Sequence, residues 1–312
     1  MLNNTDRQTT SHLLMIRPVA FDYNAETAVN NAFQQKSVTK NIQQQAALEF
    51  DRFVEKLRAH DIDVTVVPDT PIPHTPDSIF PNNWISFHED GSIVLYPMYA
   101  VNRRAERKQH VLDTLVNKFE LLNRLDFTEA EAQNRFLEGT GSMVLDRTNR
   151  IAYACLSPRT ELALLNEWCK ALQYQPCAFY SVDANGNEIY HTNVMMCVAD
   201  QYAVICLESI PDAGERQQVV DKLTSNGKKI IEISYAQMNA FAGNMLQVQN
   251  KQGEPFLIMS SCAYNALTPA QIEMLEQKNR IIHSDLSVIE TNGGGSARCM
   301  MAEVFLPLKE KS

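Results

Sequence analysis

A cysteine on a glycine-rich segment is the residue best placed for chemistry. Gly293, Gly294 and Gly295 precede Cys299 by a few positions. Glycine adopts backbone conformations that other residues avoid, and it lets other groups approach closely. A thiol on such a turn could act as a nucleophile, because nearby backbone N–H groups can stabilise a developing anion. Taken alone, the segment fits equally well a turn before an edge strand, with Cys299 as a small buried hydrophobe.

Four other polar segments stand directly before apolar runs. They cover residues 77–83 (DSIFPNN), 138–142 (EGTGS), 190–193 (YHTN) and 242–244 (AGN). If the apolar runs are equivalent strands of a repeat, the polar segments meet around the axis of that repeat. A carboxylate, an imidazole, a thiol and several Asn side chains would then share one pocket.

The elements that must position these segments recur in the order strand, strand, helix, strand. Hairpins begin at Trp84, Met143, Val194 and Met245, which are 59, 51 and 51 residues apart. Helices are expected over residues 41–60, 103–119, 161–172, 212–223 and 269–277. Strands over 13–18 and 63–68 form a first copy that lacks one strand, and the run 300–306 would complete it and close the ring. This period predicts one radial array rather than two domains.

The composition of the chain indicates which binding partners and which cellular compartment to expect. The 312-residue chain carries a formal net charge of −9, which argues against nucleic acid and anionic membranes as partners. No apolar run is long enough to span a bilayer, and the N-terminus lacks the apolar core of a signal peptide. Seven scattered cysteines without CxxC or zinc-ligand spacing predict a cytoplasmic protein with no structural metal. We expect one domain over residues 12–308 and a flexible segment over 1–11. The oligomeric state stays open, with a homodimer as one option.

The motifs resemble those of the pentein superfamily of guanidine- and ureide-modifying enzymes. That superfamily includes arginine deiminase, dimethylarginine hydrolase, the amidinotransferases and succinylarginine dihydrolase, and the chain is most similar to a bacterial citrulline-utilisation hydrolase group. The motifs are residues 17–18 (RP), 80–84 (FPNNW), 137–142 (LEGTGS), 191–194 (HTNV) and 293–300 (GGGSARCM). The resemblance implies an α/β fold, a five-bladed pseudo-symmetric propeller of ββαβ repeats, and a catalytic reaction that uses no cofactor.

The resemblance also implies three catalytic residues. Cys299 matches the nucleophile that attacks the central carbon of a guanidine or ureide and forms a covalent thio-intermediate. His191 matches the general acid and base that protonates the leaving nitrogen and then activates water. Glu138 matches the carboxylate that orients the imidazole. The other six cysteines are expected in the core.

Two further residues match positions that hold the amino-acid end of a substrate. Arg159 corresponds to the arginine that binds the substrate α-carboxylate through its planar fork, although a surface charge at a helix start explains it almost as well. Asp77 corresponds to a residue that contacts the substrate α-ammonium group. Arg103 and Arg104 lie on an expected helix, and we expect them to be solvated or to pack against other residues.

Amides stand where relatives carry acids. One acid that holds the substrate cation in arginine deiminase and dimethylarginine hydrolase falls at Asn82 or Asn83, and a second, in arginine deiminase, falls at Asn193. A buried guanidinium without a paired carboxylate would cost several kcal/mol, whereas a neutral ureido group needs only hydrogen bonds, which Asn can both donate and accept. Asn244, in the fourth polar segment, is a further candidate for substrate binding.

These departures favour a ureido substrate, citrulline above all, converted to ornithine, CO2 and ammonia. Succinylarginine dihydrolase has amides at similar places and yet starts from a guanidine, so arginine or an N-acylarginine stays an alternative substrate. Residues 96–98 (YPM) stand where the dimethylarginine enzymes place a carboxylate-binding arginine, which leaves the tail of the substrate open. An amidinotransferase and a non-catalytic binding propeller are the remaining alternatives.

Overall fold

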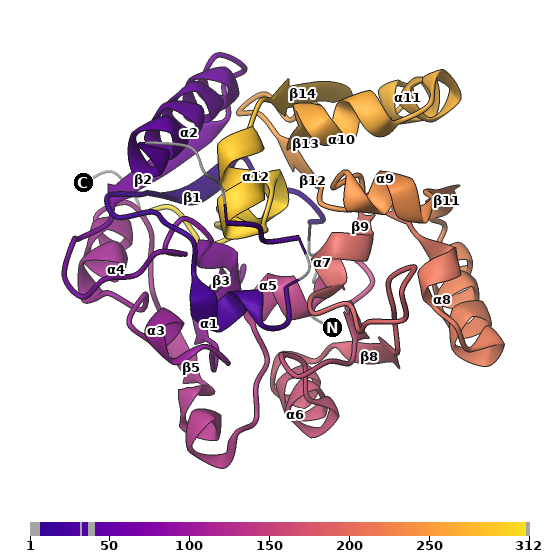
Figure 1. Cartoon of the computed structure of the whole chain (residues 1–312), viewed down its shortest axis with the longest axis horizontal. Coiled ribbons are helices and arrows are strands. Elements are labelled where there is room, and N and C mark those ends of the chain that lie inside the picture. The colour runs from indigo at the N-terminus through magenta and orange to yellow at the C-terminus, as the bar shows by residue number, and fades with distance from the viewer. Residues whose placement is uncertain (1–6, 32, 37–40, 310–312) are drawn as a thin grey trace.

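Five three-stranded sheets surround a central axis (Figure 1). The computed structural model describes residues 7–31, 33–36 and 41–309. The strand orders are β15-β1-β2, β3-β4-β5, β6-β7-β8, β11-β10-β9 and β12-β13-β14. In every sheet the central strand pairs antiparallel with one neighbour and parallel with the other. A parallel neighbour needs a crossover, which a helix supplies, so the five-bladed ββαβ propeller is confirmed.

The strand bounds follow the expected repeat closely. The strands are β1 (His12–Arg17), β2 (Asp63–Pro68), β3 (Ile85–Phe87), β4 (Ser92–Leu95), β5 (Asn123–Asp126), β6 (Val144–Asp146), β7 (Ile151–Cys155), β8 (Gln175–Phe179), β9 (Met196–Val198), β10 (Tyr202–Ile205), β11 (Lys229–Glu232), β12 (Leu246–Gln249), β13 (Pro255–Ser260), β14 (Arg280–Ser284) and β15 (Ala302–Glu303). The central strands β7 and β10 are buried at every position, as expected for strands covered on both faces.

The crossover helices lie outside the sheets (Figure 1). They are α2 (Ile42–Arg58), α4 (Gln109–Val116), α6 (Leu162–Leu172), α8 (Ala213–Ser225) and α11 (Pro269–Glu276). In α6, the Glu161 side chain accepts hydrogen bonds from two backbone N–H groups of the first turn, and Leu165 and Trp168 are buried toward the sheet. N-terminal capping and an apolar face thus define this helix.

The remaining helices are short. They are α1 (Ala25–Ala28), α3 (Val101–Arg104), α5 (Gly139–Ser142), α7 (Thr192–Met195), α9 (Tyr235–Asn239), α10 (Ser261–Ala266), α12 (Ser287–Gly293), η1 (Pro81–Asn83), η2 (Thr128–Gln133), η3 (Leu207–Ser209) and η4 (Ala297–Met300). Several of them replace the first residues of expected strands. The strand expected from Val194, for example, begins at Met196 because α7 ends there.

The last strand closes the ring as the sequence predicts. β15 pairs antiparallel with β1, with Leu14 opposite Ala302, and Val304 N donates to His12 O at 2.8 Å. The strand is shorter than the apolar run 300–306 because η4 occupies the start of that run. Closure gives the N-terminal strand a second neighbour and removes a free sheet edge.

One expectation about local structure is wrong. The helix expected over 103–119 divides into α3 and α4, because Arg103 and Glu106 turn into the molecule and pair there instead of continuing a surface helix. In the N-terminal segment, Gln8 and Thr10 are buried. The Gln8 amide donates to Leu145 O and Val198 O at 3.0 and 3.1 Å, and so bridges two blades. Residues 1–6 lie outside the described residues.

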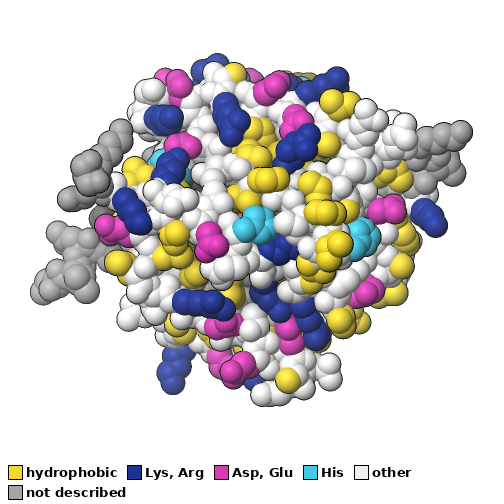
Figure 2. All heavy atoms as spheres, turned by 90° about the vertical axis from the view of Figure 1, so that its left-hand side faces the viewer, with side chains coloured by type: hydrophobic (Ala, Val, Ile, Leu, Met, Phe, Trp, Pro, Cys, Tyr) yellow, Lys and Arg dark blue, Asp and Glu magenta, His cyan; other side chains and the backbone are white. Residues whose placement is uncertain are grey.

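The surface carries charge of both signs. Figure 2 shows basic and acidic side chains interspersed with hydrophobic ones on the face that it draws. Among the residues that the structure describes, no helix is long and apolar enough to cross a bilayer, and no group of three or more His, Cys, Asp or Glu side chains could hold a metal ion.

Candidate active site

The polar segments before the inner strands meet at one end of the axis. α5 packs against η1 and α7, and η1 packs against η4. Close backbone approach makes this possible: Gly139 has a φ of +50°, and a Cβ placed on it would lie 2.3 Å from Asn82 O. A cavity opens here, and its lining is Thr27, Asn31, Asp77, Phe80, Asn83, Arg103, Arg159, Tyr190, His191, Gly293, Gly294, Gly295 and Cys299.

Cys299 lies on η4 with its sulfur between two amides. Asn244 Nδ2 lies 3.3 Å from Cys299 Sγ, and Asn193 Nδ2 lies 3.5 Å from it. The Asn244 amide has a fixed orientation, because its Oδ1 accepts a hydrogen bond from Arg298 N at 3.0 Å. The N–H groups of Asn244 therefore point to the sulfur and to Asn193 O. Both amides can stabilise negative charge that develops on the sulfur.

His191 and Glu138 form a buried pair. His191 Nε2 and Glu138 Oε2 are 2.8 Å apart, and Glu138 Oε1 accepts a hydrogen bond from Tyr99 N. Burial alone would raise the pKa of Glu138, but the charge of Arg159 and the hydrogen bond from His191 outweigh it and lower the pKa to about 2. An ionised carboxylate only accepts hydrogen bonds. Nε2 therefore carries the proton, and Nδ1 is the basic nitrogen of His191.

The imidazole is neutral at pH 7. Burial lowers the pKa of His191 to about 4, although Glu138 raises it and Arg159 lowers it further. Gly141 leaves the space that this ring occupies, because a Cβ at position 141 would lie 2.8 Å from His191 Nδ1. A neutral imidazole that shares the cavity with Cys299 can accept a proton.

Asn83 presents a hydrogen-bond donor that has no partner. Arg103 Nη1 donates to Asn83 Oδ1 at 2.9 Å, and a guanidinium can only donate, so the amide orientation is fixed with Nδ2 on the other side. That nitrogen is close to His191, since a Cβ on Gly141 would lie 2.4 Å from Asn83 Nδ2 and 2.8 Å from His191 Nδ1. Within the described part of the chain Asn83 Nδ2 is buried without a hydrogen-bond acceptor.

Arg103 is a residue of the site that sequence reasoning did not assign to it. Of the two expected alternatives, solvated or packed, the structure shows the second, because Arg103 is 3% exposed, and it also lines the cavity. Glu106 holds it through two hydrogen bonds of 2.8 and 3.0 Å. Arg103 brings a guanidinium into the site although residues 96–98 lack the arginine found in the dimethylarginine enzymes.

Asp77 lies next to this cation. Its Oδ2 accepts hydrogen bonds from Asn24 Nδ2 and Thr27 Oγ1 at 2.7 and 3.1 Å and lies 3.8 Å from Arg103 Nε. Its Oδ1 is buried without a partner in the described residues. Burial raises the pKa of Asp77 above its usual value, against the opposing charge of Arg103. Asp77 thus has an oxygen atom that could accept a hydrogen bond from a ligand.

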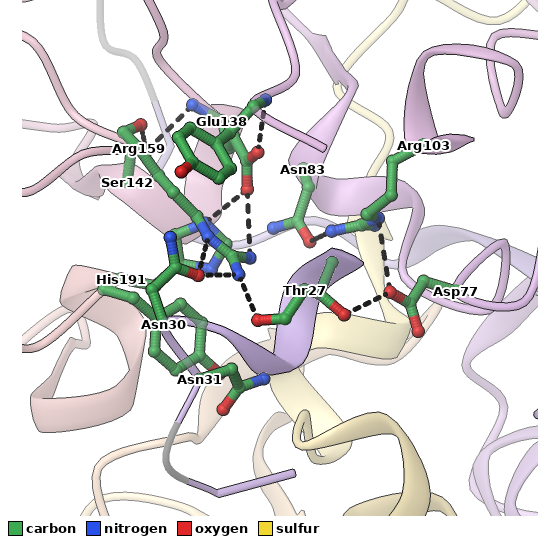
Figure 3. Close-up of polar contacts among 12 residues, drawn as sticks. Thr27, Asn30, Asn31, Asp77, Asn83, Arg103, Glu138, Ser142, Arg159 and His191 are labelled. Atoms are coloured by element: carbon green, nitrogen blue, oxygen red, sulfur yellow. Dashed lines mark hydrogen bonds and ion pairs between the residues drawn. The ribbon is translucent and has the colours of Figure 1, made fainter. Parts of the chain in front are cut away.

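Arg159 lines the cavity, and its guanidinium group is hydrogen-bonded to residues of the N-terminal segment. Figure 3 shows its guanidinium between Asn30, Thr27 and Glu138. Nη2 donates to Thr27 O at 2.9 Å, Nε donates to Asn30 Oδ1 at 3.0 Å, and Nη1 lies 3.6 Å from Glu138 Oε2. The guanidinium also lies 4.9 Å from the ring centroid of Tyr190. A substrate carboxylate that binds Arg159 must therefore replace contacts to Thr27 and Asn30.

The remaining expected residues divide into two groups. Asn193 and Asn244 contact the cysteine sulfur, whereas Asn82 does not line the cavity and instead donates to Thr140 Oγ1 at 3.3 Å. Sequence reasoning missed Tyr190 and the residues of segment 24–31. Tyr190 stands next to His191 in a polar segment, which was an available signal. Segment 24–31 carries no motif, and only the fold brings it over the cavity.

The fold and the site together define a pentein, the class of five-bladed α/β propellers that modify guanidine and ureide groups. The chain belongs to the family described as N,N dimethylarginine dimethylhydrolase, eukaryotic, whose model matches residues 17–306. The description of that family names a hydrolase of dimethylarginine, a guanidino compound. No curated protein matches the chain.

Solved structures share this fold at low sequence identity. ArgZ, an arginine dihydrolase from the ornithine-ammonia cycle in Cyanobacteria, matches with a TM-score of 0.76 and 19% identity, over 96% of this chain and 41% of that one. The chain thus spans about two fifths of that relative. An N-terminal domain of ArgZ bound covalently to a reaction intermediate matches at a TM-score of 0.75 and 19% identity, over 95% of this chain and 98% of that one. A dimethylarginine dimethylaminohydrolase adduct with S-methyl-L-thiocitrulline matches with a TM-score of 0.63 and 13% identity, over 95% of this chain and 99% of that one.

Proposed function

We propose that the chain hydrolyses the ureido group of citrulline to ornithine, CO2 and ammonia. The observation that carries this proposal is the unpartnered Nδ2 of Asn83, beside His191 in the cavity that holds Cys299. A buried donor without an acceptor costs about 1–3 kcal/mol. The ureido oxygen supplies an acceptor, whereas a guanidinium has donors only.

The orientation of the amides supports the same choice. The oxygen of the Asn83 amide accepts a hydrogen bond from Arg103, which is paired with Glu106, so the Asn83 N–H groups stay available to an acceptor on the ligand. Asn193 Oδ1 is buried and has no hydrogen-bond partner among the described residues, so it offers an acceptor for a ureido N–H.

The proposed reaction needs only this chain and water. Cys299 loses its proton to His191 Nδ1, and the sulfur attacks the ureido carbon. The bond from that carbon to the side-chain nitrogen breaks, and His191 returns the proton to the departing amine of ornithine. His191 then takes a proton from water, the hydroxide attacks the thiocarbamate carbon, and the C–S bond breaks. The proton on His191 returns to the released thiolate of Cys299, which restores both groups. Carbamate is released and decomposes to CO2 and ammonia. If the terminal nitrogen leaves first, the final products are the same.

Arginine is the second candidate substrate, because one observation favours a cation. Asp77 Oδ1 is a carboxylate oxygen without a partner, and Asp77 lines the cavity. ArgZ, which has the same fold, is an arginine dihydrolase. In our proposal Asp77 instead contacts the α-ammonium group of citrulline, and Arg159 or Arg103 contacts its α-carboxylate.

The test is incubation of the purified protein with citrulline and, separately, with arginine, with ornithine and ammonia measured in each. We expect ornithine and ammonia from citrulline, and loss of both with Cys299→Ala. Citrulline that accumulates from arginine and is not consumed would overturn the proposal and indicate a deiminase. Glycine added to the arginine reaction reveals an amidinotransferase through a new guanidino product. A protein that binds citrulline without turnover would be a binding propeller.

A further inference from the structure

Glu290 is a buried carboxyl group that the proposed reaction does not use. It lies on α12 and is 6% exposed. Its Oε1 accepts a hydrogen bond from Ser296 Oγ at 2.6 Å, and its backbone O accepts one from Gly294 N at 2.9 Å. The hydroxyl of Ser260, at the end of β13, also hydrogen-bonds the carboxyl group. Glu290 therefore holds the turn from Gly294 to Ser296 at both of its ends.

This turn carries the nucleophile. Cys299 N donates to Ser296 O at 3.0 Å, so the backbone of Ser296 begins the short helix that presents Cys299. A Cβ on Gly295 would lie 3.3 Å from Cys299 Cβ and 2.9 Å from the ring of Phe80. The turn is thus packed without spare room, and a shift of Ser296 moves the sulfur-bearing residue.

We propose that Glu290 is a positioning residue that fixes the turn bearing Cys299, and that ionisation of Glu290 loosens this turn. The role acts through Ser296 and requires no contact between Glu290 and substrate. It goes beyond the proposed function, because it concerns how the thiol is held rather than which substrate it attacks.

The charges that face Glu290 favour its neutral form. Glu49 faces it from α2, Asp285 from the segment before α12, and Cys262 from α10. Burial raises the pKa of Glu290 to about 7, Glu49 and Asp285 raise it further, and the two serine hydroxyls oppose the rise. None of the named groups is a cation. Glu290 also borders a cavity of about 500 Å³ with Asp285, Ser287 and Thr291, through which water can reach it.

Ionisation would therefore leave a buried anion held by two neutral hydroxyls. Such an anion is stabilised by moving toward water or by admitting it. Either movement pulls Ser296 with it. The thiol of Cys299, which is 4% exposed, then becomes more accessible as the pH rises through neutrality.

The experiment measures alkylation of Cys299 by iodoacetamide, followed by peptide mass spectrometry between pH 5.5 and 8.5. Glu290→Gln keeps the size and the hydrogen bonding of the side chain but cannot ionise. We expect wild type and this variant to react alike at pH 6, and the wild type to react several-fold faster at pH 8. Glu276→Gln is the matched control, since it makes the same exchange at an exposed position on α11. The ratio of its alkylation rate to that of the wild type should stay constant with pH.

Ser296→Ala tests the geometry separately from ionisation. Loss of the hydroxyl frees the turn, so Cys299 should react faster than in the wild type already at pH 6. Two results would overturn the inference. One is a ratio of wild-type to Glu290→Gln alkylation rates that does not change with pH. The other is a Ser296→Ala variant in which Cys299 is alkylated as slowly as in the wild type. Alkylation requires no substrate. Failure to hydrolyse citrulline would therefore overturn the proposed function and leave the inference standing.

Discussion

At the scale of single residues, the site depends on which atoms of its amides face the cavity. The sequence predicted that Asn83 and Asn193 replace acids, and the structure places both near Cys299. The orientation of Asn83 was beyond prediction, because it is set by Arg103. Arg103 belongs to a different segment, and the sequence predicted only that it is solvated or packs against other residues. The spacing of a repeat predicts which residues lie around one axis. It does not predict which neighbouring side chain fixes the orientation of an amide.

Asn83→Asp tests this orientation. The new carboxylate would pair with Arg103 and would present an acceptor where the amide presented a donor. Loss of one hydrogen bond to the ureido oxygen is worth about 1–3 kcal/mol, so kcat/KM for citrulline should fall about 10- to 200-fold. Asn123→Asp, which makes the same change at an exposed position on β5, should leave kcat/KM unchanged. An Asn83→Asp enzyme that uses citrulline as well as the wild type contradicts the assignment.

Glu138→Gln tests the buried pair. The carboxylate raises the pKa of His191, so its removal should move the acidic limb of kcat/KM to lower pH. In the wild type that limb should lie near pH 4, where the basic Nδ1 of His191 becomes protonated and can no longer accept a proton. Loss of the orienting group should lower kcat by about 10²-fold or more. The measurement is the pH–rate profile of Glu138→Gln. Glu129→Gln, the same exchange at an exposed position, is the control. An unshifted limb would contradict the role of Glu138.

At the scale of elements, long periodic segments were predicted well and the short inner helices were not. The apolar spacing of α2 and α6 and the hairpin of β3 and β4 carry strong local signals. The helices α5 and α7 have four residues each, too few to show a period. They form because polar turns from neighbouring blades pack on one another. Tertiary contacts, rather than a local sequence pattern, therefore determine where these two helices form.

Gly141→Ala tests how tightly α5 is packed. A Cβ there would lie 2.4 Å from Asn83 Nδ2 and 2.8 Å from His191 Nδ1. One of these side chains must move, so kcat should fall strongly while circular dichroism shows a folded protein. Gly214→Ala on α8 is the matched control, because its nearest neighbour is the exposed Asp212 at 3.1 Å. It should be neutral or slightly stabilising. Normal activity in Gly141→Ala would contradict this prediction, because it would show that α5 can move to admit a Cβ without loss of kcat.

At the scale of the whole molecule, closure of the ring also joins blades across the axis. Arg298 Nη2 donates to Glu303 Oε2 at 2.8 Å, and Arg147, which follows β6, lies 3.6 Å from Glu303 Oε1. All three side chains are buried. The sequence predicted the closing strand from its place in the repeat. It gave no sign of this ion network, because the partners come from opposite parts of the ring.

Glu303→Gln tests the network. The change keeps the shape of the side chain and leaves two buried guanidinium groups without a carboxylate. Removal of one partner from a buried ion pair costs about 3–5 kcal/mol, and we expect a fall of this order in the free energy of unfolding measured with urea. Glu232→Gln, an exposed exchange on β11, should change it by less than about 0.5 kcal/mol. Equal stability of the two variants would exclude a stabilising role for the network.

The pairing of β15 with β1 has a consequence for how the enzyme is made. During synthesis on the ribosome, β1 emerges long before its inner neighbour β15 and pairs with it last. Cys299 stands just ahead of that late strand. A chain synthesised only as far as β14 therefore lacks both the thiol and the strand that completes the first blade.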